Sequence, residues 1–422
     1  MAFTSVSAAG GQPATLVADI NTSRTGSVGQ WPFRGEFVQL GSQVLFTAVD
    51  GIHGDEVWIS DGTEAGTRLF ADICPGACSS SIWGLTAAGS RLFFSADDGV
   101  HGRELWTSDG TPAGTVLVAD LVPGLEGSGP LYLAPFGGGA VFAATDPLHG
   151  FELWISDGTA AGTVRLTDLS SPLYSPPVPW TQLGGRLIFI AQDSGSGNEL
   201  WTTDGTPGGT HILKDIRPGS ESSVFWTQEP YPGALPFAVS GGRLFFTADD
   251  GTNGSELWTS DGTEAGTLLL ADLDPTPGAS SAPRNFCALA GTVYFAAEGA
   301  GQGIELWKSD GTAAGSVLVK DIAPPGGNPS SGPSELTPVG SVVFFRAQDG
   351  EHGIELWKSD GTDAGTVLVK DIRPGEDSGV FPFGFTLTSL GGRLVFYGDD
   401  GAQGPEPWVS DGTAAGTVPL GD

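Results

Sequence analysis

The chain has 422 residues, of which 49 are acidic and 18 basic, so its formal net charge is −31. This charge repels phosphate backbones and anionic lipid surfaces and argues against nucleic acid as a partner. No run of about 18 apolar residues occurs, so the sequence predicts no membrane-spanning helix. Glycine (67) and proline (30) are abundant and 39% of residues are apolar, which suits a large core with many turns.

The first residues, MAFTSVSAAGG, lack the basic and long apolar regions of an intact signal peptide. We expect residues 1–13 to form a flexible N-terminus. Further along the chain, Cys74 and Cys78 flank a Pro-Gly turn in CPGAC. This spacing allows either a small loop disulfide, typical of an oxidising compartment, or two free thiols in a turn.

A repeat accounts for most of the chain. Each copy has a tryptophan, a phenylalanine twelve residues before it and an aspartate fourteen residues after it. No copy carries an insertion between the phenylalanine and the aspartate, so all length variation falls between one block and the next. The blocks are centred on Trp58, Trp106, Trp154, Trp201, Trp258, Trp307, Trp357 and Trp408.

The second copy shows the expected elements in chain order. The apolar run 91–97 predicts a strand that ends in an Asp-Gly turn, and 104–108 predicts the next strand. A turn-rich loop, DGTPAGT, separates it from a third strand at 116–121. A weaker strand ending in Gly-Gly or Gly-Ser precedes each block. Four strands in each repeat of about 40–50 residues are typical of a β-propeller. We therefore expect an all-β fold, a single eight-bladed propeller formed by residues 1–422 as one domain.

The two ends of the chain suggest how such a ring would close. Leu16–Ile20, LVADI, copies the last strand of a repeat although no block precedes it. The final repeat ends in VPLGD, where Pro419 cannot donate a ladder hydrogen bond. Our hypothesis is that the N-terminal strand pairs into the last blade and leaves the PLGD tail outside.

The block ELWTSDGTPAGT resembles the ELWxxDGT repeat of bacterial, notably myxobacterial, exported proteins, and is more loosely similar to the repeats of TolB-type propellers. The resemblance extends from about Leu16 to Asp422, with departures at Val57, Thr203, Ser316 and Pro407. It implies an exported propeller in an extracellular, cell-surface or periplasmic location. It offers no catalytic motif to transfer.

Alternate connections of a propeller share a face. The segments between blocks and the turns between the second and third strands would therefore share one face. Four of the five histidines would lie on that face as well. Because all length variation falls there, we expect this face to carry the function. Its non-repeated aromatic and acidic residues are the candidate ligand-binding set: Trp31, Trp83, Trp180, Phe225, Trp226, Glu229 and Tyr231.

The repeated glutamate, two residues before each tryptophan, is the other candidate site. A buried carboxylate must be paired or hydrogen-bonded, and only four copies have an arginine on the preceding strand. Backbone amides or a cation must serve the others. Asp98 with Glu104 and Asp250 with Glu256 could supply oxygen ligands for calcium, the one cofactor considered; a hydrogen-bonded turn is the alternative. Histidine at four of these turns is replaced by Ser196, Asn253 or glutamine elsewhere, which suits a polar turn residue.

No nucleophile, base and acid stand apart from the repeats, so we expect no catalytic residue and lean toward a non-enzymatic protein. The main hypothesis is an exported scaffold that binds a protein partner through its variable-loop face. A glycan-binding, lectin-like module, with or without calcium, is one alternative, because aromatic side chains stack on sugar rings. A hydrolase or lyase with its site on the same face is the other.

Overall fold

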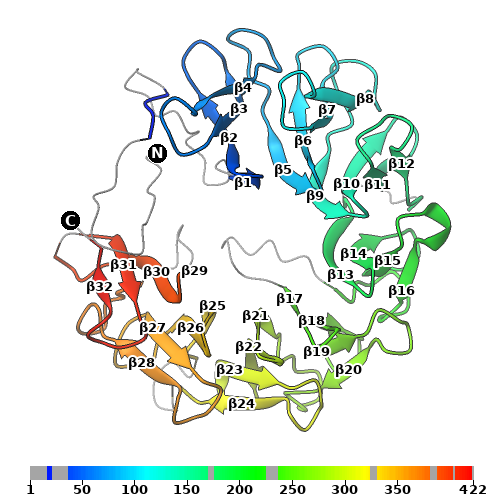
Figure 1. Ribbon diagram of the computed structural model, residues 1–422. Helices are drawn as coiled ribbons and strands as arrows, with labels where there is room; N and C mark the ends of the chain where they lie inside the picture. The colour runs from blue at the N-terminus through cyan, green and yellow to red at the C-terminus, as the bar shows by residue number, and fades with distance from the viewer. Residues whose placement is uncertain are drawn as a thin grey trace. The chain divides into compact units, whose positions relative to one another are not determined.

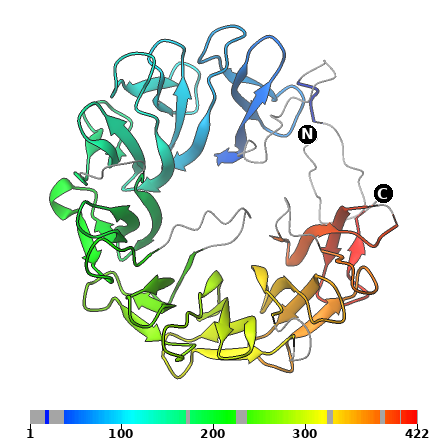
Figure 2. The same ribbon diagram turned by 180° about the vertical axis from the view of Figure 1, so that it is seen from behind.

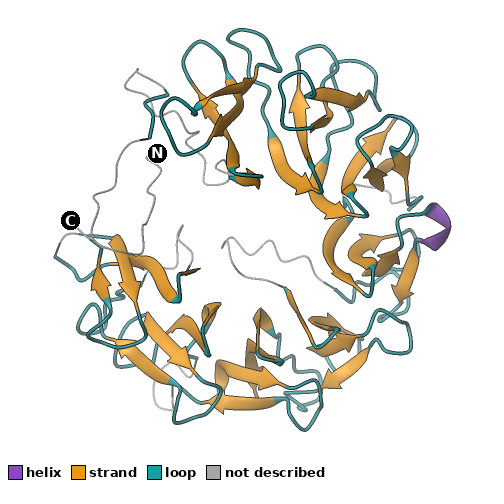
Figure 3. Cartoon of the chain, viewed as in Figure 1, coloured by secondary structure: helices purple, strands orange, loops and turns teal. Residues whose placement is uncertain are grey.

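The computed structural model describes residues 17–20, 37–169, 175–224, 236–323, 330–380, 387–402 and 404–420. Within these residues the chain is all-β, and its strands form eight antiparallel sheets of four. Helical structure in the described ranges is limited to one 3-10 turn, Pro207–Gly209 (Figure 3). None of the helices in the described part is long and apolar enough to cross a membrane.

The chain divides into two compact units, Met1–Ile212 and Leu213–Asp422. Strand β16 begins in the first unit and ends in the second. The strands of the first unit are β1 (Val38–Leu40), β2 (Gln43–Val49), β3 (Asp55–Ser60), β4 (Arg68–Ala71), β5 (Trp83–Ala88), β6 (Arg91–Asp97), β7 (Arg103–Ser108), β8 (Val116–Ala119), β9 (Leu131–Phe136), β10 (Gly139–Asp146), β11 (Gly150–Ser156), β12 (Val164–Arg165), β13 (Val178–Leu183), β14 (Arg186–Gln192), β15 (Asn198–Thr203) and β16 (His211–Lys214).

The second unit holds the other four sheets. Its strands are β17 (Phe237–Ser240), β18 (Arg243–Asp249), β19 (Ser255–Ser260), β20 (Leu268–Ala271), β21 (Arg284–Leu289), β22 (Thr292–Gly299), β23 (Gly303–Ser309), β24 (Val317–Lys320), β25 (Ser334–Val339), β26 (Val342–Ala347), β27 (Glu355–Ser359), β28 (Val367–Lys370), β29 (Thr388–Leu390), β30 (Arg393–Gly398), β31 (Glu406–Ser410) and β32 (Val418–Pro419).

Each sheet is a meander, because its four strands are hydrogen-bonded in the order in which they occur. In each unit the first strands of successive sheets lie on the inner side and the fourth strands on the outer side (Figures 1 and 2). The predicted strand order of the repeat is thus confirmed, and it is the order of a propeller blade.

The spacing of phenylalanine and tryptophan sets the register of the central hairpin. Phe46 lies directly opposite Trp58, and the equivalent pair is opposed in all eight sheets, through to Phe396 and Trp408. The two rings pack into the core between sheets. In one such cluster, Ile372 from the end of one sheet packs with Phe396 and Trp408 of the next. Because both faces of a sheet are covered, the second strands are continuous apolar runs.

The loop between the third and fourth strands, here called the outer loop, explains the DGTxxGT sequence. Asp61 accepts hydrogen bonds from the amide and hydroxyl of Thr63 at 2.9 and 2.7 Å, and the Thr63 hydroxyl accepts one from the Gly66 amide. A Cβ atom at Gly66 would lie 1.9 Å from the Asp61 carboxylate, so the second glycine is required. The aspartate therefore builds a turn, as its position predicts.

The first strands carry a recurrent bulge. The register of β5, β9, β13, β21 and β25 shifts against the second strand near the start of each of these six-residue strands. At the bulge Tyr132, Asn285 and Glu335 have φ of 54°, 58° and 55°. This backbone turns the side chain toward the next sheet: Asn285 donates to the Pro333 carbonyl at 3.0 Å. The bulge thus connects neighbouring first strands.

The ends of the chain differ from the sequence-based expectation. Val418 and Pro419 form β32 and pair with β31, so the last sheet supplies its own fourth strand, and this described part of the tail lies within the sheet. Val17–Ile20 form no strand within the described residues. Ile20 nevertheless packs against Phe46 and Trp58, as Ile372 packs against Phe396 and Trp408. Residues 1–13, predicted to be flexible, lie outside the described residues.

Candidate functional site

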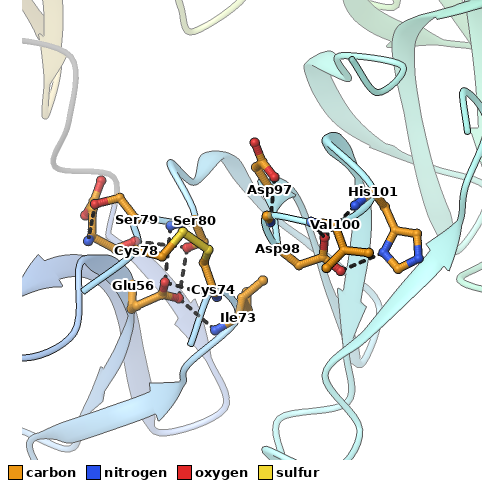
Figure 4. Close-up of a disulfide and its surroundings, with 12 residues drawn as sticks. Glu56, Ile73, Cys74, Cys78, Ser79, Ser80, Asp97, Asp98, Val100 and His101 are labelled. Atoms are coloured by element: carbon orange, nitrogen blue, oxygen red, sulfur yellow. Dashed lines mark hydrogen bonds and ion pairs between the residues drawn. A yellow bond between two sulfur atoms is a disulfide. The ribbon is translucent and has the colours of Figure 1, made fainter. Parts of the chain in front are cut away.

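Seven of the eight repeat glutamates are buried, and they organise one side of their sheets. We call this side the connection face: it comprises the segments between sheets and the turns between second and third strands, here called middle turns. Glu56 is fully buried. Its carboxylate accepts hydrogen bonds from the Ile73 amide at 2.9 Å and the Cys74 amide at 3.3 Å, both in the connection after β4 (Figure 4). Ser80 adds its amide at 3.2 Å and its hydroxyl at 2.9 Å.

The same arrangement recurs along the chain. Ser128 donates its hydroxyl to Glu104, Ser281 donates to Glu256 at 2.6 Å, and Ser331 donates to Glu305 at 2.6 Å. Backbone amides complete each set. We name each glutamate with its donors a carboxylate node. Burial raises the pKa of these glutamates, while the hydrogen bonds oppose the rise.

The node serines were missed in the sequence, although a signal existed. Ser80, Ser128, Ser281 and Ser331 lie 24 to 26 residues after their glutamates. The variable length of the connections hid this spacing, because the alignment of repeats stops at the fourth strand. These four glutamates thus accept hydrogen bonds from backbone amides and serine hydroxyls.

Each node also ties one sheet to the next. The Ser80 carbonyl accepts a hydrogen bond from the Asp97 amide at the end of β6, at 2.9 Å. Ser331 does the same for Gln348 at 3.0 Å. One connection therefore holds both its own glutamate and the following sheet, which makes the repeated part of the connection face a rigid frame.

The middle turns are closed by a second set of carboxylates. Asp98 accepts hydrogen bonds from the amides of Val100 and His101 at 2.9 and 2.8 Å, and its other oxygen lies 2.7 Å from His101 Nδ1. The hydrogen bond with Asp98 raises the pKa of His101. Where histidine is replaced, Asn253 donates to Asp250 at 2.8 Å. The position is a polar turn residue, as its substitutions predict.

The candidate calcium ligands do not converge. Asp98 and Asp250 receive donors from their own turns, whereas Glu104 and Glu256 receive donors from the connections. In the described ranges no group of three or more histidine, cysteine, aspartate or glutamate side chains could hold a metal ion. Hydrogen bonds occupy these four carboxylates in the structure, and calcium binding by them stays a prediction.

Two of the seven candidate ligand-binding residues, Trp83 and Trp180, lie within the described part of the chain. Trp31, Phe225, Trp226, Glu229 and Tyr231 lie outside the described residues. Trp83, at the start of β5, is 49% exposed. Trp180 lies at the bulge of β13 and is half-buried. The glycan-binding hypothesis, which depended on this set, stays a prediction.

The structure joins Cys74 and Cys78 in a disulfide, one of the two states that the spacing allowed. The bridge closes the connection that supplies Ser80 to Glu56 (Figure 4). It also packs against the next middle turn, because a Cβ atom at Gly99 would lie 3.2 Å from Cys74 Sγ. The remaining cysteine, Cys287, is buried, and burial raises the pKa of its thiol to about 11.

Comparisons with known proteins give structural matches only. No family model matches the chain, and no curated protein matches its sequence. Among solved structures, a puromycin hydrolase is 15% identical with a TM-score of 0.38, over 81% of this chain and 54% of its own. Oligopeptidase B from Leishmania major is 12% identical with a TM-score of 0.44, over 89% and 52%. A puromycin-hydrolyzing peptidase from Mycobacterium tuberculosis is 12% identical with a TM-score of 0.39, over 95% and 64%. The chain thus spans about half to two thirds of these proteins.

These comparisons contradict the expectation of a non-enzymatic binding scaffold. The matched structures are hydrolases and peptidases, and none of them is described as a non-enzymatic scaffold. The expectation rested on the lack of a catalytic motif in the sequence, and a missing motif does not exclude chemistry. At this identity the likeness concerns the fold, and no residue role is carried over.

Proposed function

We propose that the eight sheets form one eight-bladed propeller and that this propeller serves a hydrolytic enzyme, with the connection face turned to the substrate. The observation that carries the proposal is the construction of that face. Carboxylate nodes hold the repeated part rigid, while the connections alone vary in length and sequence. Binding and catalytic residues are often found on loops held by such a scaffold.

Amide bonds are the substrate class to test first. The descriptions of the matched proteins name peptidases and puromycin hydrolysis. The half-exposed indole of Trp83, at the connection-face end of a first strand, would contact an apolar group of such a substrate.

The test is hydrolysis of puromycin and of a panel of peptide anilides by the purified chain. We expect turnover that co-elutes with the protein and a several-fold rise in KM for Trp83→Ala. Leu268→Ala is the matched control, because Leu268 is 41% exposed but lies on a fourth strand. If no substrate is cleaved at any protein concentration, or if both variants behave alike, the proposal fails.

Ring closure belongs to the same proposal. Ile20 packs against Phe46 and Trp58 of the first sheet. In each following sheet for which a core cluster is described, the equivalent phenylalanine and tryptophan pack against a residue that follows the preceding fourth strand, as Phe396 and Trp408 pack against Ile372. We therefore assign Leu16–Ile20 to the outer edge of the last blade, next to β32. Ile20→Asp should lower the melting temperature by several degrees, and an unchanged value would contradict closure by this segment.

We also propose that the chain belongs to the ELWxxDGT-repeat proteins and that, like them, it is exported. The Cys74–Cys78 disulfide supports it, because disulfides persist in oxidising compartments. Cell fractionation of the producing organism, with the chain followed by antibody, tests the assignment. A purely cytosolic distribution would overturn it.

A further inference from the structure

Three neighbouring sheets of the first unit present an exposed apolar side chain at the same place in their middle turns. Ile52 is 71% exposed, Val100 64% and Leu148 85%. Leu125, in the connection after β8, is 75% exposed. We call these four side chains the apolar row. In the other sheets the turn position holds a small or polar residue: Gly195, Thr252, Gly301, Glu351 or Ala402. The repeat therefore does not require an apolar side chain there.

The middle turns fix the backbone beneath three of these side chains. In each turn an aspartate two residues earlier accepts a hydrogen bond from the amide of the apolar residue, at 2.8 to 2.9 Å: Asp50 from Ile52, Asp98 from Val100 and Asp146 from Leu148. The same aspartate binds the side chain of the histidine that follows. The exposed side chains are thus held on an ordered backbone, which reduces the conformational entropy lost when a partner binds.

The connection after β4 lies between the first and second of these turns. Gly54 of the first turn donates to the Gly76 carbonyl at 3.2 Å. On the other side, a Cβ atom at Gly99 of the second turn would lie 3.2 Å from Cys74 Sγ. Figure 4 shows this connection beside the turn that carries Val100. The first two turns therefore belong to one continuous surface, with the disulfide-closed connection between them.

The connection after β8 extends this surface to the third sheet. A Cβ atom at Gly102, also in the second turn, would lie 2.7 Å from the Leu125 carbonyl oxygen. Further along the connection, the Ser128 carbonyl accepts a hydrogen bond at 2.9 Å from the amide of Thr145, which precedes the third turn. The apolar row thus extends over three sheets, and contiguous exposed apolar side chains with a polar rim mark binding surfaces.

Carboxylates form the rim of the apolar row. Four exposed ones lie in the connections of these sheets: Asp72, Asp120, Glu126 and Asp168. Two arginines lie among the described residues of these turns and the adjoining strand ends, and both are already engaged. Arg165 lies 4.0 Å from Asp146 and 3.9 Å from Asp168. Arg103 donates to the Ser81 carbonyl at 2.6 Å. The rim is therefore acidic.

We propose that the apolar row docks a peptide segment that carries both aliphatic and basic side chains. The aliphatic side chains cover Ile52, Val100 and Leu148, and the lysine or arginine side chains lie against the acidic rim. A second copy of this chain, or an anionic lipid surface, would bring like charge to that rim. The inference rests on the proposed function, because it names the class of peptide that the hydrolase takes on its connection face.

Fluorescence anisotropy with the full chain tests docking before cleavage products accumulate. The probe is a short labelled peptide of leucine, lysine and serine. We expect the triple variant Ile52→Ser, Val100→Ser, Leu148→Ser to bind it at least about tenfold more weakly, because three apolar contacts are lost. The double variant Val116→Ser, Val164→Ser is the matched control, since both side chains are exposed but lie on fourth strands. Its affinity should be unchanged.

Two comparisons on the wild-type chain remain decisive if the triple variant does not fold. A peptide with glutamate in place of lysine should not bind measurably, because the rim repels it. The affinity for the lysine peptide should fall several-fold when the salt concentration is raised from about 0.05 to 0.5 M, because salt screens exposed charges.

The proposal is overturned if the triple variant and the control bind the peptide equally well, or if the glutamate peptide binds as tightly as the lysine peptide. Self-association that the triple variant abolishes, measured by sedimentation, would assign the row to a second copy instead. Binding without cleavage of the same peptide would support the row and count against hydrolysis. Cleavage with an unchanged KM in the triple variant would count against the row alone.

Discussion

At the scale of single residues, the repeat contains two hydrogen-bonded arrangements, the outer loop and the carboxylate node, and each depends on particular residue types. The outer loop needs its aspartate as an acceptor and its second glycine as space. The carboxylate node needs glutamate as a buried acceptor and, in four sheets, serine as a donor. These requirements explain why the motif recurs with so few changes.

Adjacent glycines in one outer loop test the space requirement. A Cβ atom at Gly209 would lie 2.1 Å from the Asp204 carboxylate, whereas one at Gly208 meets nothing within 4 Å. We expect Gly209→Ala to lower the free energy of unfolding by roughly 1–3 kcal/mol and Gly208→Ala to change it by less than about 0.5 kcal/mol. Urea denaturation of both variants is the measurement. Equal losses in the free energy of unfolding for the two variants would show that the contact between the added Cβ atom and Asp204 does not destabilise the turn.

The node serine is tested by Ser331→Ala. The variant removes a 2.6 Å hydrogen bond to a buried carboxylate, so we expect a loss of about 1.5–3 kcal/mol in the free energy of unfolding at pH 8. Ser220→Ala is the control, because Ser220 is exposed. A loss no larger than that of the control would mean that the amides alone satisfy Glu305.

At the scale of elements, the first strands differ most from sheet to sheet. In β25, Glu335 sits at the bulge with a positive φ and forms a buried ion pair with Arg346 of β26 at 3.3 Å. Glu335 also accepts the Leu387 amide from the next sheet at 3.2 Å. Arg346 was recognised in the sequence as non-repeated, but its role in packing was not predictable, because the bulge that turns Glu335 toward it arises from strand pairing.

Arg346→Met tests this ion pair. It leaves the Glu335 carboxylate buried without its cation, and we expect a loss of about 3–5 kcal/mol in the free energy of unfolding. The double variant Glu335→Gln with Arg346→Met should lose less, since no charge is then stranded. The two variants are compared in urea at neutral pH; a double variant as unstable as the single one would argue against a buried charge as the cause.

At the scale of the whole molecule, charge burial predicts how stability depends on pH. Burial raises the pKa of Glu56, Glu104, Glu152, Glu256, Glu305 and Glu335, and that of Glu355 to about 7. The hydrogen bond to a turn aspartate raises the pKa of His53, His101 and His352. A folded-state pKa above the unfolded value adds stability at low pH that is lost as the pH rises through the folded value.

The turn aspartates act in the opposite sense. Hydrogen bonds within the turns outweigh the effect of burial and lower the pKa of Asp50, Asp98 and Asp349, so their contribution is lost as the pH falls below about 3.8. We therefore expect the melting temperature to be highest between about pH 4.5 and 6 and to fall toward pH 8. Calorimetry at constant ionic strength measures it, and a steady rise from pH 6 to pH 8 would contradict the assignment.

The sequence by itself determined the local architecture of this protein. A fixed distance between Phe94 and Trp106, with an Asp-Gly turn between them, sets the hairpin register, and DGTxxGT encodes its own turn. Both are short-range, so they can be recognised from spacing. Only the tertiary structure decided the partners of Glu56 and the bulges of the first strands, because these depend on connections of variable length and on the neighbouring sheet. For the same reason Glu355 looked like every other repeat glutamate in the sequence, and only the structure shows that Gly379 donates to it through a backbone amide where other sheets supply a serine.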